Sequence, residues 1–93
     1  MEAFMYILLY GNGQYYTGST TNLEKRVEQY HLGEGANFTK KHLPVRLVYF
    51  ETFDRIDEAF EREKQIQNWS KSKKEALINR DFKVLKELCK GKN

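Results

Sequence analysis

Two strand-forming runs near the start of the chain, separated by a glycine-rich tripeptide, constrain its fold most strongly. Residues 4–10 and 14–20 are rich in aromatic and β-favouring side chains, which are typical of extended backbone. Between the runs, Asn12 and Gly13 can adopt the positive φ angles that tight primed turns require. The sequence therefore predicts an antiparallel β-hairpin.

The next segment predicts a helix, a loop and a third strand. Thr21 or Asn22 can cap a helix that ends at Gly33, and residues 33–44 are expected to form a surface loop suited to binding. Residues 45–53 are apolar on both alternating faces, as in a strand that is covered on both sides. We therefore expect this third strand to lie in the middle of the sheet.

Three helical segments follow the third strand. The first can be capped by Asp54 or Asp57, the second spans residues 70–78, and the third covers residues 81–88. The order β-β-α-β-α-α-α predicts a single domain over residues 1–93, of the α/β (α+β) class, in which helices flank a three-stranded antiparallel sheet. The inward stripe of the first of these helices is expected to comprise Ile56, Ala59, Phe60, Glu63, Ile66 and Trp69.

The composition is that of a small globular chain. The 93 residues are 40% hydrophobic and 31% charged with one proline, which excludes a disordered tail and a collagen-like repeat. No apolar run approaches the roughly 20 residues of a membrane span, and residues 1–10 do not resemble a secretory signal. We therefore expect a cytoplasmic protein without a membrane partner. The single cysteine, Cys89, excludes an internal disulfide and argues against a zinc site.

Positive charge is concentrated in the last third of the chain. Residues 1–63 carry seven Lys or Arg against ten Asp or Glu, whereas residues 64–93 carry nine against three. Such asymmetry is typical of contact with a polyanion, most often nucleic acid. A solvated, lysine-rich helix surface is the alternative interpretation.

One carboxylate breaks the hydrophobic pattern. Glu63 follows Ala59 by four residues and precedes Ile66 by three, which places it on the apolar stripe of its helix. Removing a carboxylate from water costs several kcal/mol unless a cation or a metal ion offsets this cost. Glu63 is therefore a candidate metal ligand, and a helix-edge glutamate paired with an arginine is the alternative.

A second pair of polar residues lies on the first predicted helix. Arg26 and Tyr30 are four residues apart and therefore share one helix face. A guanidinium suits bidentate contact with phosphate, and a phenol can donate a proton or, when ionised, accept one. A surface arginine stacked over an aromatic ring is the alternative.

Together these residues resemble a known nuclease family. The hairpin carries Met5-Tyr6-Ile7 and Tyr16-Thr17-Gly18, and Arg26, Tyr30 and Glu63 follow in order. In this arrangement the chain resembles the GIY-YIG nuclease domain, most closely the small stand-alone GIY-YIG proteins of an uncharacterised family. The recognisable core covers about residues 4–79. The glycine and isoleucine of the first motif are replaced by Phe4 and Met5.

The resemblance implies a specific set of site residues. It makes Gly18 a structural position of the second motif, Asn79 a possible match to a late asparagine, and Glu63 the ligand of one Mg²⁺ or Mn²⁺ ion. Ser19 stands where some relatives have lysine. The implied catalytic residues are Tyr6, Tyr16, Arg26, Tyr30 and Glu63.

The implied activity is hydrolysis of phosphodiester bonds in DNA by a divalent-metal-dependent endonuclease, structure-selective and linked to repair or recombination. Arg26 would hold the scissile phosphate, and either Tyr6 or Tyr16 would activate the water. Since an ordinary tyrosine has a pKa near 10, about three units above neutrality, Arg26 and the metal are expected to lower it. The expected contacts to the nucleic-acid backbone are Lys40, Lys41, Arg46, Lys71, Lys73 and Lys74.

Two alternatives belong to other functional classes. The domain could bind nucleic acid without cleaving it, in which case binding would be metal-independent and would tolerate loss of Glu63. It could also act only with a protein partner that supplies specificity, since no appended recognition domain accompanies the core.

Overall fold

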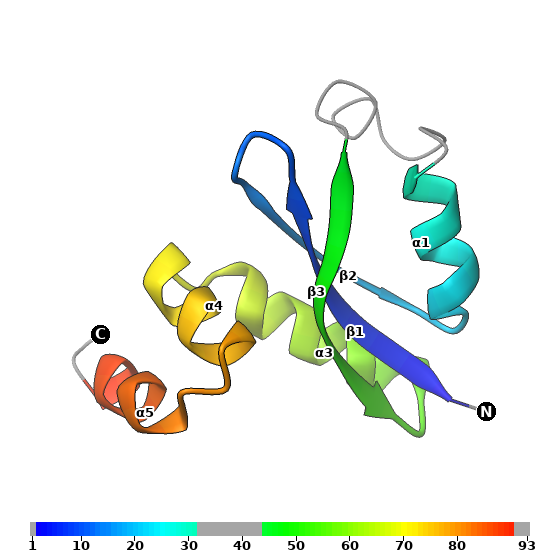
Figure 1. Ribbon diagram of the computed structural model, residues 1–93. Coiled ribbons are helices and arrows are strands. Elements are labelled where there is room, and N and C mark those ends of the chain that lie inside the picture. Colours follow the sequence, from blue (N-terminus) through cyan, green and yellow to red (C-terminus); the bar gives the residue numbers. More distant parts are fainter. Residues whose placement is uncertain (1, 32–43, 91–93) are drawn as a thin grey trace.

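The computed structural model describes residues 2–31 and 44–90 of the chain. Most of the predicted binding loop, with Lys40 and Lys41, lies outside the described residues. The element order is the predicted one (Figure 1). The elements are β1 (Ala3–Tyr10), β2 (Tyr15–Thr20), α1 (Leu23–His31), β3 (Val45–Phe53), α3 (Ile56–Gln67), α4 (Lys71–Ile78) and α5 (Phe82–Lys90).

The three strands form one antiparallel sheet in the order β2-β1-β3. The expectation that residues 45–53 form the middle strand is therefore wrong, because β1 lies between the other two. Strand β1 is the most continuously apolar of the three, and its side chains are buried on both faces. Strand β3 is an edge strand, on which Arg46 and Phe50 are exposed.

The hairpin turn differs from the predicted type. The Tyr10 N–H donates to the Gln14 carbonyl, and the Gly13 N–H donates to the Tyr10 carbonyl, each at 2.9 Å. Gly13 has a φ of +87°, whereas Asn12 is outside the positive region. The connection is a three-residue loop with glycine in the left-handed position, and only one residue needs a positive φ.

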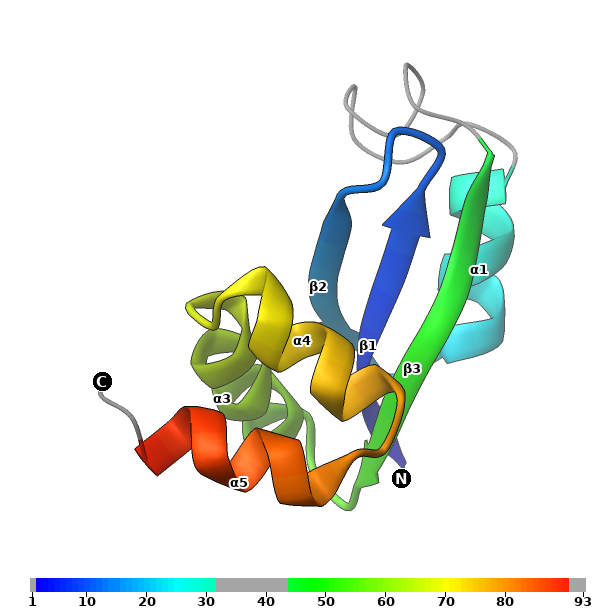
Figure 2. The same cartoon turned by 60° about the vertical axis from the view of Figure 1, so that its left-hand side comes forward.

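Helices cover both faces of the sheet. Figures 1 and 2 show α1 on one face and α3 with α4 on the other. Since side chains alternate along a strand, β1 supplies both layers. On the α3 face the core comprises Met5, Ile7, Tyr49, Ile66 and Leu77. On the α1 face it comprises Tyr6, Leu8, Tyr10, Tyr30 and Val45.

Within residues 2–31 and 44–90, side chains cap three helices as the sequence predicted. Asn22, Ser70 and Asp81 each accept a hydrogen bond from the backbone N–H three residues later, at 3.1, 3.3 and 3.3 Å respectively. These bonds satisfy donors that the first turn of a helix leaves unpaired. None of the helices in residues 2–31 and 44–90 is long and apolar enough to cross a membrane.

The start of α3 corrects a prediction. Neither Asp54 nor Asp57 caps this helix, because the cap residue is Arg55, whose side chain makes no capping bond. Instead, the Arg55 guanidinium donates to both carboxylate oxygens of Asp57, at 3.0 and 3.1 Å. This exposed pair contributes little to stability.

The inward stripe of α3 is narrower than predicted. Ala59 and Ile66 are fully buried, whereas Ile56 and Phe60 are 45% and 48% exposed. Phe60 follows Ala59 by one residue and is therefore rotated about 100° around the helix axis. Glu63 lies beside the buried line and is partly buried.

Candidate active site

Tyr6 and Gly18 form the base of the candidate site. They are directly opposite each other in the β1–β2 ladder, and Tyr6 is fully buried. A Cβ atom at position 18 would come within 2.6 Å of Cζ of Tyr6, so the phenol occupies the space above the Gly18 backbone. Glycine at this position lets the tyrosine of the central strand extend over β2.

Helix α1 contributes Arg26 and Tyr30 to the same site. The Nη1 atom of Arg26 donates to the hydroxyl of Tyr6 at 3.1 Å, and this guanidinium is partly buried. Tyr30 is 5% exposed, and its ring centroid lies 5.8 Å from that of Tyr16 on β2. Arg26 and Tyr30 are thus part of a larger cluster with Tyr6 and Tyr16, and the alternative of an isolated surface pair does not hold.

The three phenols of this cluster are hard to ionise in the protein alone. Burial raises the pKa of Tyr16 and of Tyr30 to about 12. Burial also raises the pKa of Tyr6, although interactions with Tyr30 and Arg26 oppose the increase. Arg26 lowers the pKa of all three phenols, as expected, but the loss of hydration on burial outweighs its positive charge.

Glu63 approaches the site from the other face of the sheet. Its Oε1 atom accepts a hydrogen bond from the hydroxyl of Ser19 at 2.7 Å. Ser19 follows Gly18 on β2, so its side chain points to the face that α3 covers. The negative charge of Glu63 contributes to the raised pKa of Tyr16, whereas Arg26 opposes the increase. The cluster therefore extends around β2, at the edge of the sheet.

The alternative of a structural ion pair for Glu63 does not hold within the described part of the chain. No lysine or arginine there forms a salt bridge with Glu63. The neighbouring Arg62 instead donates to Glu51 on β3, at 2.9 and 3.2 Å. Glu63 is consequently a partly buried carboxylate that has a hydroxyl, and no described cation, as its partner.

This environment fits a metal site with a single protein carboxylate. The Oε2 atom of Glu63 makes no hydrogen bond with the described residues, which contain no group of three or more His, Cys, Asp or Glu side chains suited to a metal. Mg²⁺ commonly binds through one or two carboxylates and retains several waters. Glu63 could therefore hold one Mg²⁺ or Mn²⁺ ion, with water as most of its ligands.

Ser19 is a member of the site that sequence reasoning missed. The family resemblance implied only that Ser19 stands where some relatives have lysine. Strand alternation could have placed it on the face opposite Tyr16 and Gly18. Its contact with Glu63 depends on how α3 packs, which no local pattern reveals.

A second network fixes the orientation of α3. The hydroxyl of Tyr49 donates to Glu51 at 2.6 Å, and the Arg62 guanidinium that contacts Glu51 lies 5.5 Å from the ring of Trp69. Burial alone would raise the pKa of Glu51, but hydrogen bonds from Arg62 and Tyr49 hold it below its ordinary value. Because Arg62 precedes Glu63, this anchor to β3 also positions the candidate metal ligand.

Two other predicted site residues, Asn79 and Arg46, lie away from the cluster. Asn79 ends α4, and the next residue, Arg80, stacks on Tyr49 of β3 at 5.4 Å, toward the opposite edge of the sheet. Arg46 is on β3 itself. Helix α4 carries three lysines that were predicted to contact nucleic acid. Lys71 and Lys74 border β2, whereas Lys73 is partly buried elsewhere on the helix.

The chain is similar to known proteins over most of its length. A family model described as the GIY-YIG catalytic domain matches residues 2–76. This range includes Tyr6, Tyr16, Arg26, Tyr30 and Glu63. A UPF0213 protein of Natronomonas pharaonis is 43% identical over 77 residues, covering 83% of this chain and 91% of that protein. A UPF0213 protein of Staphylococcus saprophyticus is 42% identical over 76 residues, covering 82% and 93%.

A solved structure is also similar. The solution NMR structure of a UPF0213 protein from Bacillus halodurans superposes with a TM-score of 0.55 at 35% identity. The similarity covers 85% of this chain and 84% of that one.

Proposed function

The chain belongs to the GIY-YIG family, and on this premise we propose that it is a divalent-metal-dependent endonuclease that hydrolyses phosphodiester bonds in DNA. The observation that carries the proposal is the assembly of Tyr6, Tyr16, Arg26 and Tyr30 beside one edge strand, with Glu63 on its other side. A phosphate at this edge would face both a guanidinium and a carboxylate able to hold a metal.

Arg26 is suited to the developing negative charge. One of its N–H groups is used by Tyr6, which fixes the orientation of the guanidinium and leaves other donors for phosphate oxygens. Such preorganised donors stabilise a transition state by several kcal/mol, on the order of 3 in measured cases. We therefore assign Arg26 to the scissile phosphate.

Tyr16 is the better candidate for contact with the attacking water. Tyr6 is fully buried, whereas Tyr16 is partly exposed and borders solvent. Tyr30 interacts with the hydroxyls of both tyrosines and can relay a proton between them. Since Arg26 contacts Tyr6 directly, negative charge that spreads through the phenols is most favourable on Tyr6.

A cation bound by Glu63 would supply positive charge to the phosphate and would favour ionisation of the adjacent Tyr16. Without such charge, a phenol with a pKa of about 12 is almost entirely protonated at neutral pH. By holding a cation, Glu63 would thus both stabilise the negative charge of the phosphate and favour ionisation of Tyr16.

The test compares Glu63→Gln with a matched substitution on the same helix. Glu61 is exposed, so Glu61→Gln removes the same charge away from the cluster. Plasmid, single-stranded, flapped and branched DNA would be incubated with Mg²⁺ or Mn²⁺. We expect the wild type and Glu61→Gln to cleave at least one substrate, and Glu63→Gln to be slower by about 100-fold. No cleavage by the wild type, or equal rates for Glu63→Gln, would refute the proposal.

The high phenol pKa values favour one other candidate, a nucleic-acid-binding module that retains the fold without cleavage. Its binding would be unchanged by EDTA and by Glu63→Gln and would weaken steeply with salt. Selectivity for branched or damaged DNA, a role in repair or recombination, and a protein partner that supplies specificity are further parts of the proposal. The substrate panel and a pull-down with the purified chain address them separately.

A further inference from the structure

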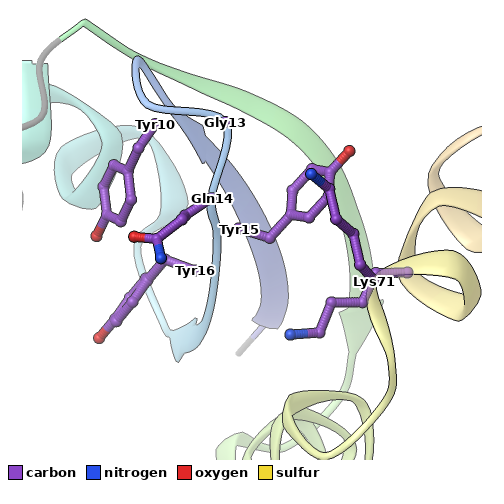
Figure 3. Close-up of a pocket in the computed structure, with 7 residues that line it drawn as sticks. Tyr10, Gly13, Gln14, Tyr15, Tyr16 and Lys71 are labelled. Carbon is purple, nitrogen blue, oxygen red and sulfur yellow. The ribbon is translucent and has the colours of Figure 1, made fainter.

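A groove of about 350 Å³ runs along β2 next to the candidate active site. We call it the hairpin groove. Figure 3 shows Tyr10 and Tyr16 on one side of the strand and Tyr15 with Lys71 on the other. Its principal lining residues are Tyr10, Gln14, Tyr15, Tyr16, Lys71 and Lys74.

One wall of the hairpin groove is a supported aromatic surface. Tyr16 is partly exposed, and its ring lies 6.1 Å from that of Tyr10 and 5.8 Å from that of Tyr30. Both of these neighbours are buried, which limits the movement of the Tyr16 ring. A rigid aromatic face of this kind is suited to stacking against a flat ligand.

The other wall carries two positive charges without described partners. Neither Lys71 nor Lys74 forms an ion pair within residues 2–31 and 44–90. The adjacent carboxylate of Glu75 is instead bonded by the hydroxyl of Tyr15 at 3.3 Å. Lys74 is partly buried, and this burial lowers its pKa. A partly desolvated ammonium group favours an anionic ligand.

An aromatic face on one side of β2 and paired lysines on the other match one nucleotide of an unpaired strand that lies across the edge of β2. Single-stranded nucleic acid is typically bound by stacking of bases on aromatic rings and by lysines along the phosphates. Inside a duplex, both faces of a base are covered by its neighbours. Gln14 is exposed and can bond to a base edge.

We propose that the hairpin groove binds an unpaired nucleotide next to the cleaved bond, with its base on Tyr16 and its phosphate on Lys71 and Lys74. The inference rests on the proposed function, because Tyr16 belongs to both the groove and the candidate active site. It also deepens that function, since the substrate must be single-stranded or locally unpaired at this position.

The test measures binding in EDTA, where no cleavage occurs. The probe is a fluorescein-labelled ten-residue thymidine oligonucleotide, and the readout is fluorescence anisotropy from 25 to 200 mM salt. The double variant Lys71→Gln/Lys74→Gln is compared with Lys83→Gln/Lys86→Gln, which removes two exposed charges from α5. Thermal melting confirms that all proteins are folded.

We expect the groove variant to bind about tenfold more weakly than the wild type. The slope of log affinity against log salt concentration should fall in magnitude by about 0.7, because one neutralised phosphate is lost. The α5 control should stay within about twofold. An abasic probe with the same number of phosphates should bind the wild type about tenfold more weakly, because it lacks the base that stacks on Tyr16. A Tyr16→Phe variant should retain binding because its ring is unchanged.

Equal binding by the groove variant and the α5 control would overturn the inference. So would a duplex probe that binds as tightly as the single strand at equal phosphate number. Cleavage is scored separately: if no protein cleaves but binding requires Lys71 and Lys74, only the proposed function fails. If Glu63-dependent cleavage occurs and the groove variant retains its KM and its affinity, only the inference fails.

Discussion

The ring of Tyr6 lies over the backbone of Gly18, its direct partner in the β1–β2 ladder. This contact brings a tyrosine of the central strand to the hydroxyl cluster beside the edge strand. Arg26 then bonds to the Tyr6 hydroxyl from α1. A position without a side chain is therefore a condition for the whole site.

Gly18→Ala tests this relationship. The added methyl group would overlap the Tyr6 phenol, so we expect a loss of about 1 to 3 kcal/mol in the free energy of unfolding, measured with urea, and a displaced Tyr6–Arg26 contact. In the control Gly13→Ala, the methyl group meets nothing within 4 Å, and only the φ of +87° adds strain. That control should leave the Arg26 side-chain NMR signals unchanged. Unchanged signals for Gly18→Ala as well would contradict the assigned contact.

Tyr6→Phe removes the acceptor of the Arg26 hydrogen bond and keeps the buried ring. We expect a loss of about 1 kcal/mol, because a partly buried guanidinium loses a partner. The matched variant is Tyr15→Phe, which loses a longer bond to Glu75 in an exposed setting and should cost less than about 0.5 kcal/mol. Urea unfolding measures both changes. A larger loss for Tyr15→Phe than for Tyr6→Phe would contradict this ranking.

Alkaline pH should destabilise the fold through buried tyrosines. The pKa values of Tyr16, Tyr30 and Tyr49 are raised by burial from 10.0 to about 12. Their neutral forms therefore contribute stability that is complete below pH 10. This contribution falls between pH 10 and 12, by at most about 1.4 kcal/mol per group and pH unit, because the unfolded chain ionises first.

The measurement combines melting curves from pH 9 to 11.5 with phenolate absorbance. The pKa is raised above 10.0 for five of the six tyrosines, namely Tyr6, Tyr15, Tyr16, Tyr30 and Tyr49, and the last three of these should titrate near 12. A single transition near pH 10 for all six would show that these phenols are hydrated.

Glu51→Gln tests the network that holds α3 against β3. Arg62 would lose a charged partner at 2.9 Å, and we expect a loss of about 1 to 3 kcal/mol at pH 7. The pKa of Glu51 is held below its ordinary value of 4.5, so its contribution is present above pH 4.5 and is lost as pH falls through the lower folded value. The variant should therefore lose less stability than the wild type on acidification.

The exposed pair of Arg55 and Asp57 is the control for this experiment. Asp57→Asn should change the free energy of unfolding by less than about 0.5 kcal/mol, because solvent screens the pair. Equal losses for Glu51→Gln and Asp57→Asn would show that the Glu51 network does not fix α3.

Much of the local structure could be predicted from the sequence. The strand-forming runs predicted the hairpin, and Asn22, Ser70 and Asp81 predicted three helix starts, because capping depends on residues three positions apart. Glu63 was conspicuous because it interrupts a helical stripe. The family resemblance followed from the order and spacing of such residues.

The sequence by itself determined the element order, the side-chain alternation and the polar residues that a purely structural chain would not need. Only the tertiary structure decided that β1 is central, that Tyr6 is buried above Gly18, that Ser19 meets Glu63, and that the two lysines line the hairpin groove. The reason is physical: periodicity and caps reflect interactions within a few residues, whereas strand order and burial depend on packing between segments far apart in the chain.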